Sequence, residues 1–140
     1  NYHQILKLHE VYETEKSIYL VTDFIHEKTL EQVLKRSKWQ TSVPKSETKS
    51  IMFSLLEALA EMASRGVVRR NIKPASILME DSTEIKIINF NLAFFVDSPK
   101  ENFRTCGTPG YIAPEIFLVD AGKYNSKCDV FSAGCIFFQM

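Results

Sequence analysis

The sequence predicts an α+β fold in which strands come first and helices dominate the remainder. Three patterns carry this prediction. Two apolar runs at positions 5–8 and 17–24 flank a short charged turn. Apolar residues then recur at three- and four-residue steps between positions 46 and 65, which is typical of a helix with one buried face. A last apolar segment, from about position 129, predicts a second long helix.

The two runs at the start are expected to form an antiparallel hairpin. Residues 5–8 and 17–24 are rich in residues that favour strands, and the turn at residues 13–16 reads ETEK.

Two helices are expected next. Thr29 is suited to cap the first one, which runs through Leu30 and Leu34, because its hydroxyl can accept a bond from a free N–H group of the first turn. The second helix is expected to begin at Ser46 and to end at Gly66, which suits a helix C-terminus. Its buried stripe is predicted to be Met52, Leu55, Leu56, Leu59 and Met62.

The second half is expected to alternate short elements with loops. Two strands, residues 77–79 and 85–88, flank a turn at residues 81–83. A loop-rich stretch from 89 to 115 and a short helix lead to the final helix, which is expected from about Asp129.

Composition limits the kind of partner. The chain has 140 residues, and its 17 basic and 17 acidic side chains give no net charge. Without a strong overall field, neither nucleic acid nor an anionic membrane is indicated as a partner. The 45% hydrophobic and 24% charged content is ordinary for a soluble globular protein.

The cysteines and the chain ends complete this outline. Cys106, Cys128 and Cys135 are odd in number and form no CxxC pair, so a reducing, cytoplasmic location is expected. The chain begins at Asn1 and stops within an apolar stretch at Met140, and is expected to be a piece of a longer protein.

Four motifs resemble those of protein kinase domains, in the same order. Residues 68–78 read VRRNIKPASIL and resemble the catalytic loop, H-R-D-L-x-x-x-N. Residues 89–91 read NFN where the family has D-F-G, and residues 106–115 read CGTPGYIAPE, with the A-P-E motif intact. Residues 129–134 read DVFSAG and resemble the start of helix αF.

The resemblance is strongest to Ser/Thr kinases of the calcium/calmodulin-dependent type. It implies one incomplete protein kinase-like domain over residues 1–140. Residues 1–25 would supply the last strands of the β-rich N-lobe and the hinge, and residues 26–140 the first part of the mainly helical C-lobe.

At the catalytic positions the chain departs from the family. Asn71 stands where the family has the Asp that accepts the substrate hydroxyl proton, and an amide cannot act as that base. Asn71 could have a catalytic role of another kind, or it could be a loop amide that only forms hydrogen bonds with backbone groups. Lys73 matches the family and would reach the transferred phosphate.

The metal positions are also changed. Ser76 replaces the Asn that holds a magnesium, and Asn89 replaces the Asp that bridges magnesium to the phosphates. Mg²⁺ prefers anionic oxygen ligands, so its binding is expected to be weak or absent. Asn91 replaces a glycine and is expected to keep the turn through a positive φ.

A nucleotide site is implied by the resemblance alone. Thr22 falls at the gatekeeper position and Asp23 and Ile25 in the hinge, while Leu78 and Ile88 would lie beneath an adenine ring. ATP binding is expected to be weak.

Further positions have structural or regulatory roles in the family. Arg69 replaces the usual His, and its guanidinium needs a partner or a route to solvent. Thr105 is the nearest candidate for phosphorylation beside Arg104, which stands at a position that is Thr in some relatives. The resemblance assigns the remaining roles to Arg70 (contact with a phosphorylated residue), Phe90 (the aromatic of D-F-G), Thr108 (packing on Lys73 and Asn71), Glu115 (the last residue of A-P-E) and Asp129 (bonds to loop N–H groups).

Three functions therefore compete. The first is a pseudokinase that acts through protein partners, an active kinase among them, as scaffold or allosteric regulator. The second is a Ser/Thr kinase that binds ATP and has residual phosphotransfer activity. The third is a gene fragment with no function of its own.

Overall fold

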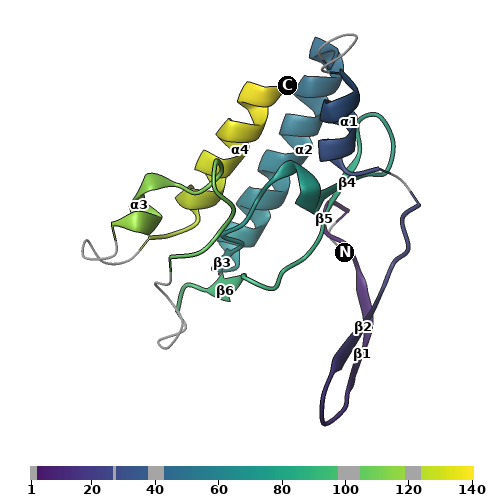
Figure 1. The fold of residues 1–140 in the computed structure, drawn as a ribbon, viewed down its shortest axis with the longest axis vertical. Coiled ribbons are helices and arrows are strands. Elements are labelled where there is room, and N and C mark those ends of the chain that lie inside the picture. The colour runs from purple at the N-terminus through teal and green to yellow at the C-terminus, as the bar shows by residue number, and fades with distance from the viewer. Residues whose placement is uncertain (1–2, 27, 38–42, 98–104, 119–123) are drawn as a thin grey trace.

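The structure, a computed structural model, describes residues 3–26, 28–37, 43–97, 105–118 and 124–140 (Figure 1). Strands come first and helices dominate the remainder, as predicted for an α+β fold. The helices are α1 (Leu30–Ser37), α2 (Lys45–Ser64), η1 (Pro74–Ser76, a 3-10 turn), α3 (Pro114–Phe117) and α4 (Lys127–Gln139). The strands are β1 (Leu8–Glu13), β2 (Ile18–Thr22), β3 (Val67–Val68), β4 (Ile77–Met79), β5 (Ile85–Ile87) and β6 (Phe94–Phe95).

The antiparallel hairpin is confirmed, but its first strand lies later than predicted. β1 pairs with β2 in a register that joins Glu13 to Ile18 and Leu8 to Thr22. Residues 5–8 were expected to be this strand because they are apolar. Instead, Ile5 forms an isolated parallel bridge with Ile87 of β5, which fixes the chain start against the body. The hairpin itself projects away from the helices (Figure 1).

α1 begins as its capping residue predicts. The Thr29 hydroxyl accepts a bond from the Gln32 backbone N–H (3.3 Å), and the Gln32 side chain accepts one from the Thr29 backbone N–H (3.0 Å). Two donors at the helix start are satisfied reciprocally by this capping box. α2 follows, and Gly66 beyond its end has a φ of +70°, which favours glycine.

The buried face of α2 differs from the predicted stripe at two positions, because Met52 is only half-buried and Leu56 is exposed. Leu55, Leu59 and Met62 are buried as predicted, whereas Leu56 is 45% exposed. Ile51 and Ala58 complete the buried face instead. The buried residues recur at three- and four-residue steps from Ile51 through Leu55, Ala58 and Leu59 to Met62, and Leu56 lies outside this arc.

Two small antiparallel sheets, β4–β5 and β3–β6, form after α2 in the chain. β4 and β5 form as predicted around residues 81–83, where the Asp81 carboxylate accepts bonds from the backbone N–H groups of Thr83 (2.6 Å) and Glu84 (2.7 Å). β3 and β6 pair Val67 with Phe95 and were missed, because two-residue strands show no alternation. α4 begins at Lys127, two residues before its predicted start.

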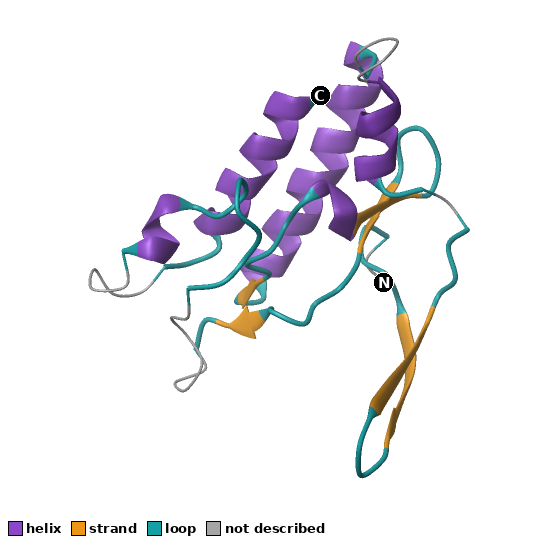
Figure 2. Ribbon diagram, viewed as in Figure 1, coloured by secondary structure: helices purple, strands orange, loops and turns teal. Residues whose placement is uncertain are grey.

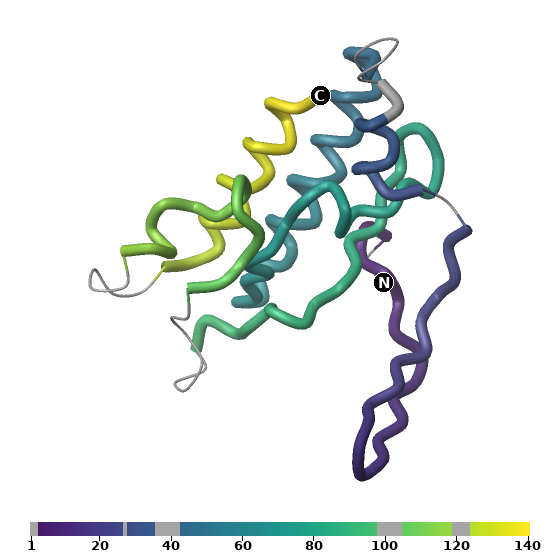
Figure 3. The backbone as a smooth tube through the Cα atoms, viewed as in Figure 1, coloured from purple at the N-terminus to yellow at the C-terminus, as the bar shows by residue number. Residues whose placement is uncertain are grey.

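α2 and α4 lie side by side, with β4 and β5 next to α2 and with β3 and β6 near the lower end of the two helices (Figure 2). One core cluster joins α1, α2, α4 and the β4–β5 sheet, and a second lies between β3, β6, α3 and the start of α4. The chain from β3 to η1 and the chain from β5 to β6 can be followed in Figure 3. The first is bonded to Asp129 in the first turn of α4, and the second is bonded to the first through Arg69 and Arg70.

Replacing Leu55 by Ala should lower the free energy of unfolding by about 2–5 kcal/mol, because the side chain is fully buried and a cavity would remain. Leu56→Ala is the matched control, since it removes the same atoms from a half-exposed position and should cost about 0.5 kcal/mol or less. Urea unfolding of the full-length protein measures both. Equal losses in the two variants would contradict the assigned face of α2.

Candidate functional site

Asp129, in the first turn of α4, holds the loop that follows β3. Its side chain is only 2% exposed, and its two carboxylate oxygens accept bonds from the backbone N–H groups of Arg69 (2.7 Å) and Arg70 (2.8 Å). Burial raises the pKa of Asp129, while the two bonds and the two guanidinium charges oppose that rise. The contact expected of Asp129 is therefore present in the structure.

Arg69 is buried completely, yet its charge has partners. Its guanidinium donates to the carbonyl oxygens of Asn71 and Ile88, both at 2.8 Å, and lies 5.7 Å from the centre of the Phe90 ring. Within the described residues its Nε has no hydrogen-bond partner. Burial lowers the pKa of Arg69 to about 10, against the opposing effect of Asp129, so the side chain remains charged at neutral pH.

Arg70 points into the second core cluster. Its Nε donates to the carbonyl oxygen of Leu92 (2.6 Å), its Nη1 donates to the Tyr124 hydroxyl (3.0 Å), and its guanidinium lies 4.4 Å from the Phe94 ring centre. Burial raises the pKa of Tyr124, and the bond from Arg70 opposes that change. The backbone of Arg70 has a φ of +65°, a strained value for a residue with a side chain.

The side chains of Lys73, Thr108 and Asn71 form a continuous chain of hydrogen bonds. Lys73 Nζ donates to the Thr108 hydroxyl (2.9 Å), which in turn donates to Asn71 Oδ1 (2.7 Å). The structure thus brings together two predicted catalytic positions and the residue expected to pack against them. Asn71 acts here as a hydrogen-bond acceptor, and an amide oxygen performs this task as an acid oxygen would.

The two predicted metal positions differ in their surroundings. Ser76 is 2% exposed, and its hydroxyl donates to the Lys73 carbonyl (2.9 Å) while accepting from the Lys73 backbone N–H (3.2 Å). Asn89 is exposed and has a φ of +62°. The positive φ expected at Asn91 is wrong by two positions, because the turn is made at Asn89. Among the described residues, no cluster of His, Cys, Asp or Glu is arranged to hold a metal ion.

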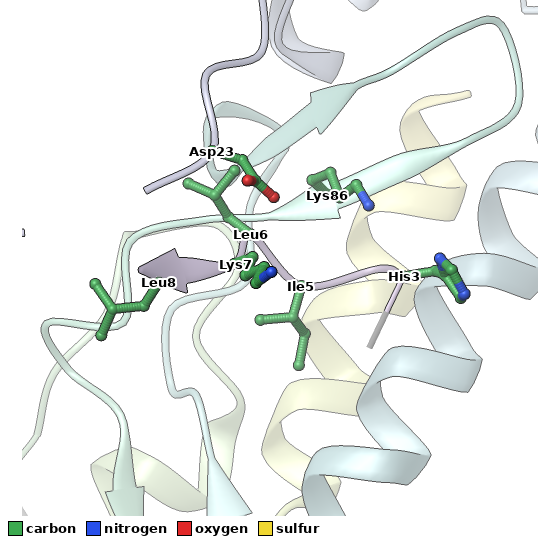
Figure 4. A pocket seen from close by; sticks show the side chains of 7 residues that line it. All are labelled: His3, Ile5, Leu6, Lys7, Leu8, Asp23 and Lys86. Carbon is green, nitrogen blue, oxygen red and sulfur yellow. The ribbon is translucent and has the colours of Figure 1, made fainter. Parts of the chain in front are cut away.

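The predicted nucleotide positions do not line one described cavity. Asp23 lines a cavity of about 600 Å³ together with Leu6, Lys7 and Lys86, among others (Figure 4). Its carboxylate lies 2.6 Å from His9 Nε2. The other four positions are absent from that lining: Thr22, which is exposed, Ile25 and Leu78, which are half-buried, and Ile88, whose carbonyl is bonded to Arg69.

Residues 105–118 contain the remaining candidates. Thr105 is exposed, with its hydroxyl 3.4 Å from the carbonyl oxygen of Ile116, and Glu115 is half-buried at the start of α3. Gly107 has a φ of +129°, and a Cβ there would lie 3.0 Å from the Arg70 carbonyl oxygen. Only glycine allows this close approach. Arg104 lies outside the described residues.

Three residues of the site were missed from the sequence: Leu92, Phe94 and Tyr124. They contact Arg70 through a carbonyl oxygen, a ring face and a hydroxyl. A carbonyl contact leaves no sequence signal. Two aromatic residues and a buried arginine have no fixed spacing, so only the fold brings them together.

A comparison with known families decides what this arrangement is. The family model described as the protein kinase domain matches residues 1–140. The chain belongs to the protein kinase domain family. β1 and β2 are therefore N-lobe strands ahead of the first C-lobe helices. The loop that follows β3 occupies the place where the motifs predict the catalytic loop.

Individual relatives agree with this assignment. The chain is 38% identical over 139 residues to the probable serine/threonine-protein kinase 2 of Plasmodium falciparum. The matched region covers 97% of this chain and 26% of that protein. It is 31% identical over 140 residues to the liver/testis phosphorylase b kinase gamma catalytic chain of Mus musculus, with 97% and 34% covered. The chain thus spans about a quarter to a third of these kinases.

One further property concerns membranes. Among the described helices of this kinase domain, none combines the length and the apolar character that a bilayer span requires.

Asp129→Asn should destabilise this kinase domain by about 3–5 kcal/mol, because an amide cannot supply two anionic acceptors and the buried arginines lose their counter-charge. The control is Glu61→Gln, which removes a charge from the exposed pair with Arg65 and should cost about 0.3–0.5 kcal/mol. Thermal or urea unfolding of the full-length protein compares them. An Asp129→Asn variant as stable as the control would disprove the anchoring role.

Proposed function

We propose that this chain is part of a pseudokinase, which acts in phosphorylation signalling as a scaffold or an allosteric regulator. The observation that carries the proposal is the environment of Asn71. Its oxygen accepts the Thr108 hydroxyl bond, so the loop keeps its tie to residues 105–118 without a carboxylate. The shape of the site is maintained while the group that would accept a proton is missing. General bases contribute about 10²–10⁴ in rate.

The proposed loss extends to the metal. Asn89 offers a neutral amide where phosphoryl transfer relies on a carboxylate held to Mg²⁺. The Ser76 hydroxyl is already engaged by both backbone groups of Lys73 and is buried, which supports weak or absent Mg²⁺ binding. Losses at groups that act together are not additive, so the two changes jointly remove efficient transfer.

A Ser/Thr kinase with residual activity is the second candidate. Lys73 favours it, because its ammonium group is positioned by Thr108 and remains half-exposed beside Asn71. The relatives named as kinases support the same candidate. Such an enzyme would need metal ligands other than Ser76 and Asn89.

Protein partners fit the proposed function better than polyanions. The chain has 17 basic and 17 acidic residues, so it offers no overall attraction for nucleic acid or an anionic bilayer. A cytoplasmic protein that binds other proteins, an active kinase among them, is the proposal that follows. Binding would use the shape of the loops around Thr108 rather than a catalytic group.

The full-length protein should transfer phosphate to peptides far below the rates of about 1–100 s⁻¹ typical of kinases. Asn71→Asp alone should restore little phosphate transfer, because the metal positions stay unchanged. The new carboxylate oxygen can still accept the hydrogen bond from the Thr108 hydroxyl, so the loop should keep its shape. The triple variant Asn71→Asp, Asn89→Asp, Ser76→Asn should restore the most. Radiolabel transfer from ATP measures all three proteins.

Asn125→Asp is the matched control for that experiment, because it changes an exposed amide to an acid outside the site. Melting curves must accompany the triple variant, since Ser76 is buried and Asn is larger. Transfer by the unchanged protein at a typical kinase rate would rule out the pseudokinase and favour the second candidate.

ATP should bind the full-length protein weakly, and without a need for Mg²⁺. The site lacks two carboxylates and keeps the charge of Lys73, so its field favours an uncompensated phosphate chain. Lys73→Met should weaken binding about tenfold, as the loss of one charged hydrogen bond predicts, whereas the exposed Lys127→Met should not. Calorimetry in chelator and then in excess Mg²⁺ measures this. Binding seen only with the metal would show that the charge argument is wrong.

A further inference from the structure

Two adjacent arginines contact the segment of residues 88–94 at four regularly spaced places. Arg69 bonds to the Ile88 carbonyl oxygen and faces the Phe90 ring, two residues further on. Arg70 repeats the pattern, because it bonds to the Leu92 carbonyl oxygen and lies over the Phe94 ring. Every second residue of the segment is therefore contacted by one of two guanidinium groups. We call Arg69 and Arg70 the arginine clamp.

The clamp itself is fixed at its backbone. Both of its N–H groups donate to the buried Asp129, and the Arg69 side chain also holds the Asn71 carbonyl oxygen. Hydrogen bonds with a charged partner are about twice as strong as neutral ones, and cation–π contacts gain strength when water is excluded. With Arg69 0% and Arg70 6% exposed, water cannot easily replace these contacts.

We propose that the arginine clamp holds residues 88–94 in a single conformation, so that this segment does not switch. Releasing it would leave each of the two buried guanidinium groups without its carbonyl partner in this segment, Ile88 for Arg69 and Leu92 for Arg70. A buried charge that loses its partner is strongly destabilising, and the released state would therefore be rarely populated. The proposal does not depend on whether the protein transfers phosphate.

Because the Arg70 side chain already has partners within the domain, the conformation of residues 88–94 should not depend on phosphorylation. Its Nε and Nη1 are bonded to Leu92 and Tyr124, and its ring contact with Phe94 lies inside the second core cluster. A phosphate group attached to Thr105, which is exposed, would have to compete with these contacts for the Nε and Nη1 groups of Arg70. The segment thus presents the exposed Asn89 and Asn91 permanently to any partner.

Hydrogen exchange of the full-length protein tests the clamp. Arg69→Met keeps the length of the side chain but removes its charged bonds, and should speed exchange in residues 88–91 about ten- to a hundredfold. Arg65→Met is the control, because Arg65 lies on the surface beyond α2, and should leave these residues unchanged. Unchanged exchange at 88–91 in a folded Arg69→Met protein would overturn the proposal.

Two further variants keep the test decisive if Arg69→Met does not fold. Phe90→Leu keeps the arginine and removes only the ring contact, and should speed exchange in residues 88–91 by a smaller factor of about two- to fivefold. Thr105→Glu should leave residues 88–94 unchanged, since the clamp is already closed. If Thr105→Glu slowed hydrogen exchange in residues 88–94, or if Phe90→Leu left exchange in residues 88–91 unchanged, the segment would not be held by the arginine clamp.

Discussion

The Asp129 carboxylate is the contact on which the rest of the site depends. It joins the first turn of α4 to backbone groups 60 and 59 residues earlier in the chain. Because both oxygens are used, the carboxylate fixes the orientation of two successive peptide units rather than the position of one atom. The directions in which Arg69 and Arg70 leave the backbone are set by this orientation. The φ of +65° at Arg70 is a strained value, and the two hydrogen bonds to Asp129 can hold the backbone in it.

The charges around this carboxylate do not balance. Two buried guanidinium groups face one buried carboxylate, and Lys73 adds a third cation at the edge of the loop. Carbonyl oxygens of Asn71, Ile88 and Leu92 supply much of the compensation through their dipoles. This excess of positive charge would repel a metal cation and attract an anion such as a phosphate group. Neutral amides at positions 71 and 89 increase this asymmetry, which is the physical basis for the proposed loss of metal-dependent chemistry.

Sequence patterns predicted the elements that carry local signals. The hairpin, the Thr29 cap, the β4–β5 pair and the Asp81 turn follow from residue types within a few positions of one another. The prediction failed where long-range contacts decide. Ile5 looks like part of a hairpin strand but bridges to Ile87 across the molecule. The family motifs brought Asn71, Lys73 and Thr108 together correctly, yet they gave no indication of where the Arg69 side chain would bond.

The geometry at Asn71 shows why fold and chemistry can separate in a kinase domain. The bond from Thr108 needs only an oxygen of the right reach, and Asn and Asp present such an oxygen on side chains of nearly equal shape. Proton abstraction instead needs a basic group, which the amide is not, and Mg²⁺ prefers the anionic oxygens that the amide lacks. Exchange of a carboxylate for an amide therefore costs the loop little structurally while removing what the reaction requires. In the proposed pseudokinase this loop stays assembled, bonded to Thr108 and anchored on Asp129, and would act as a rigid surface.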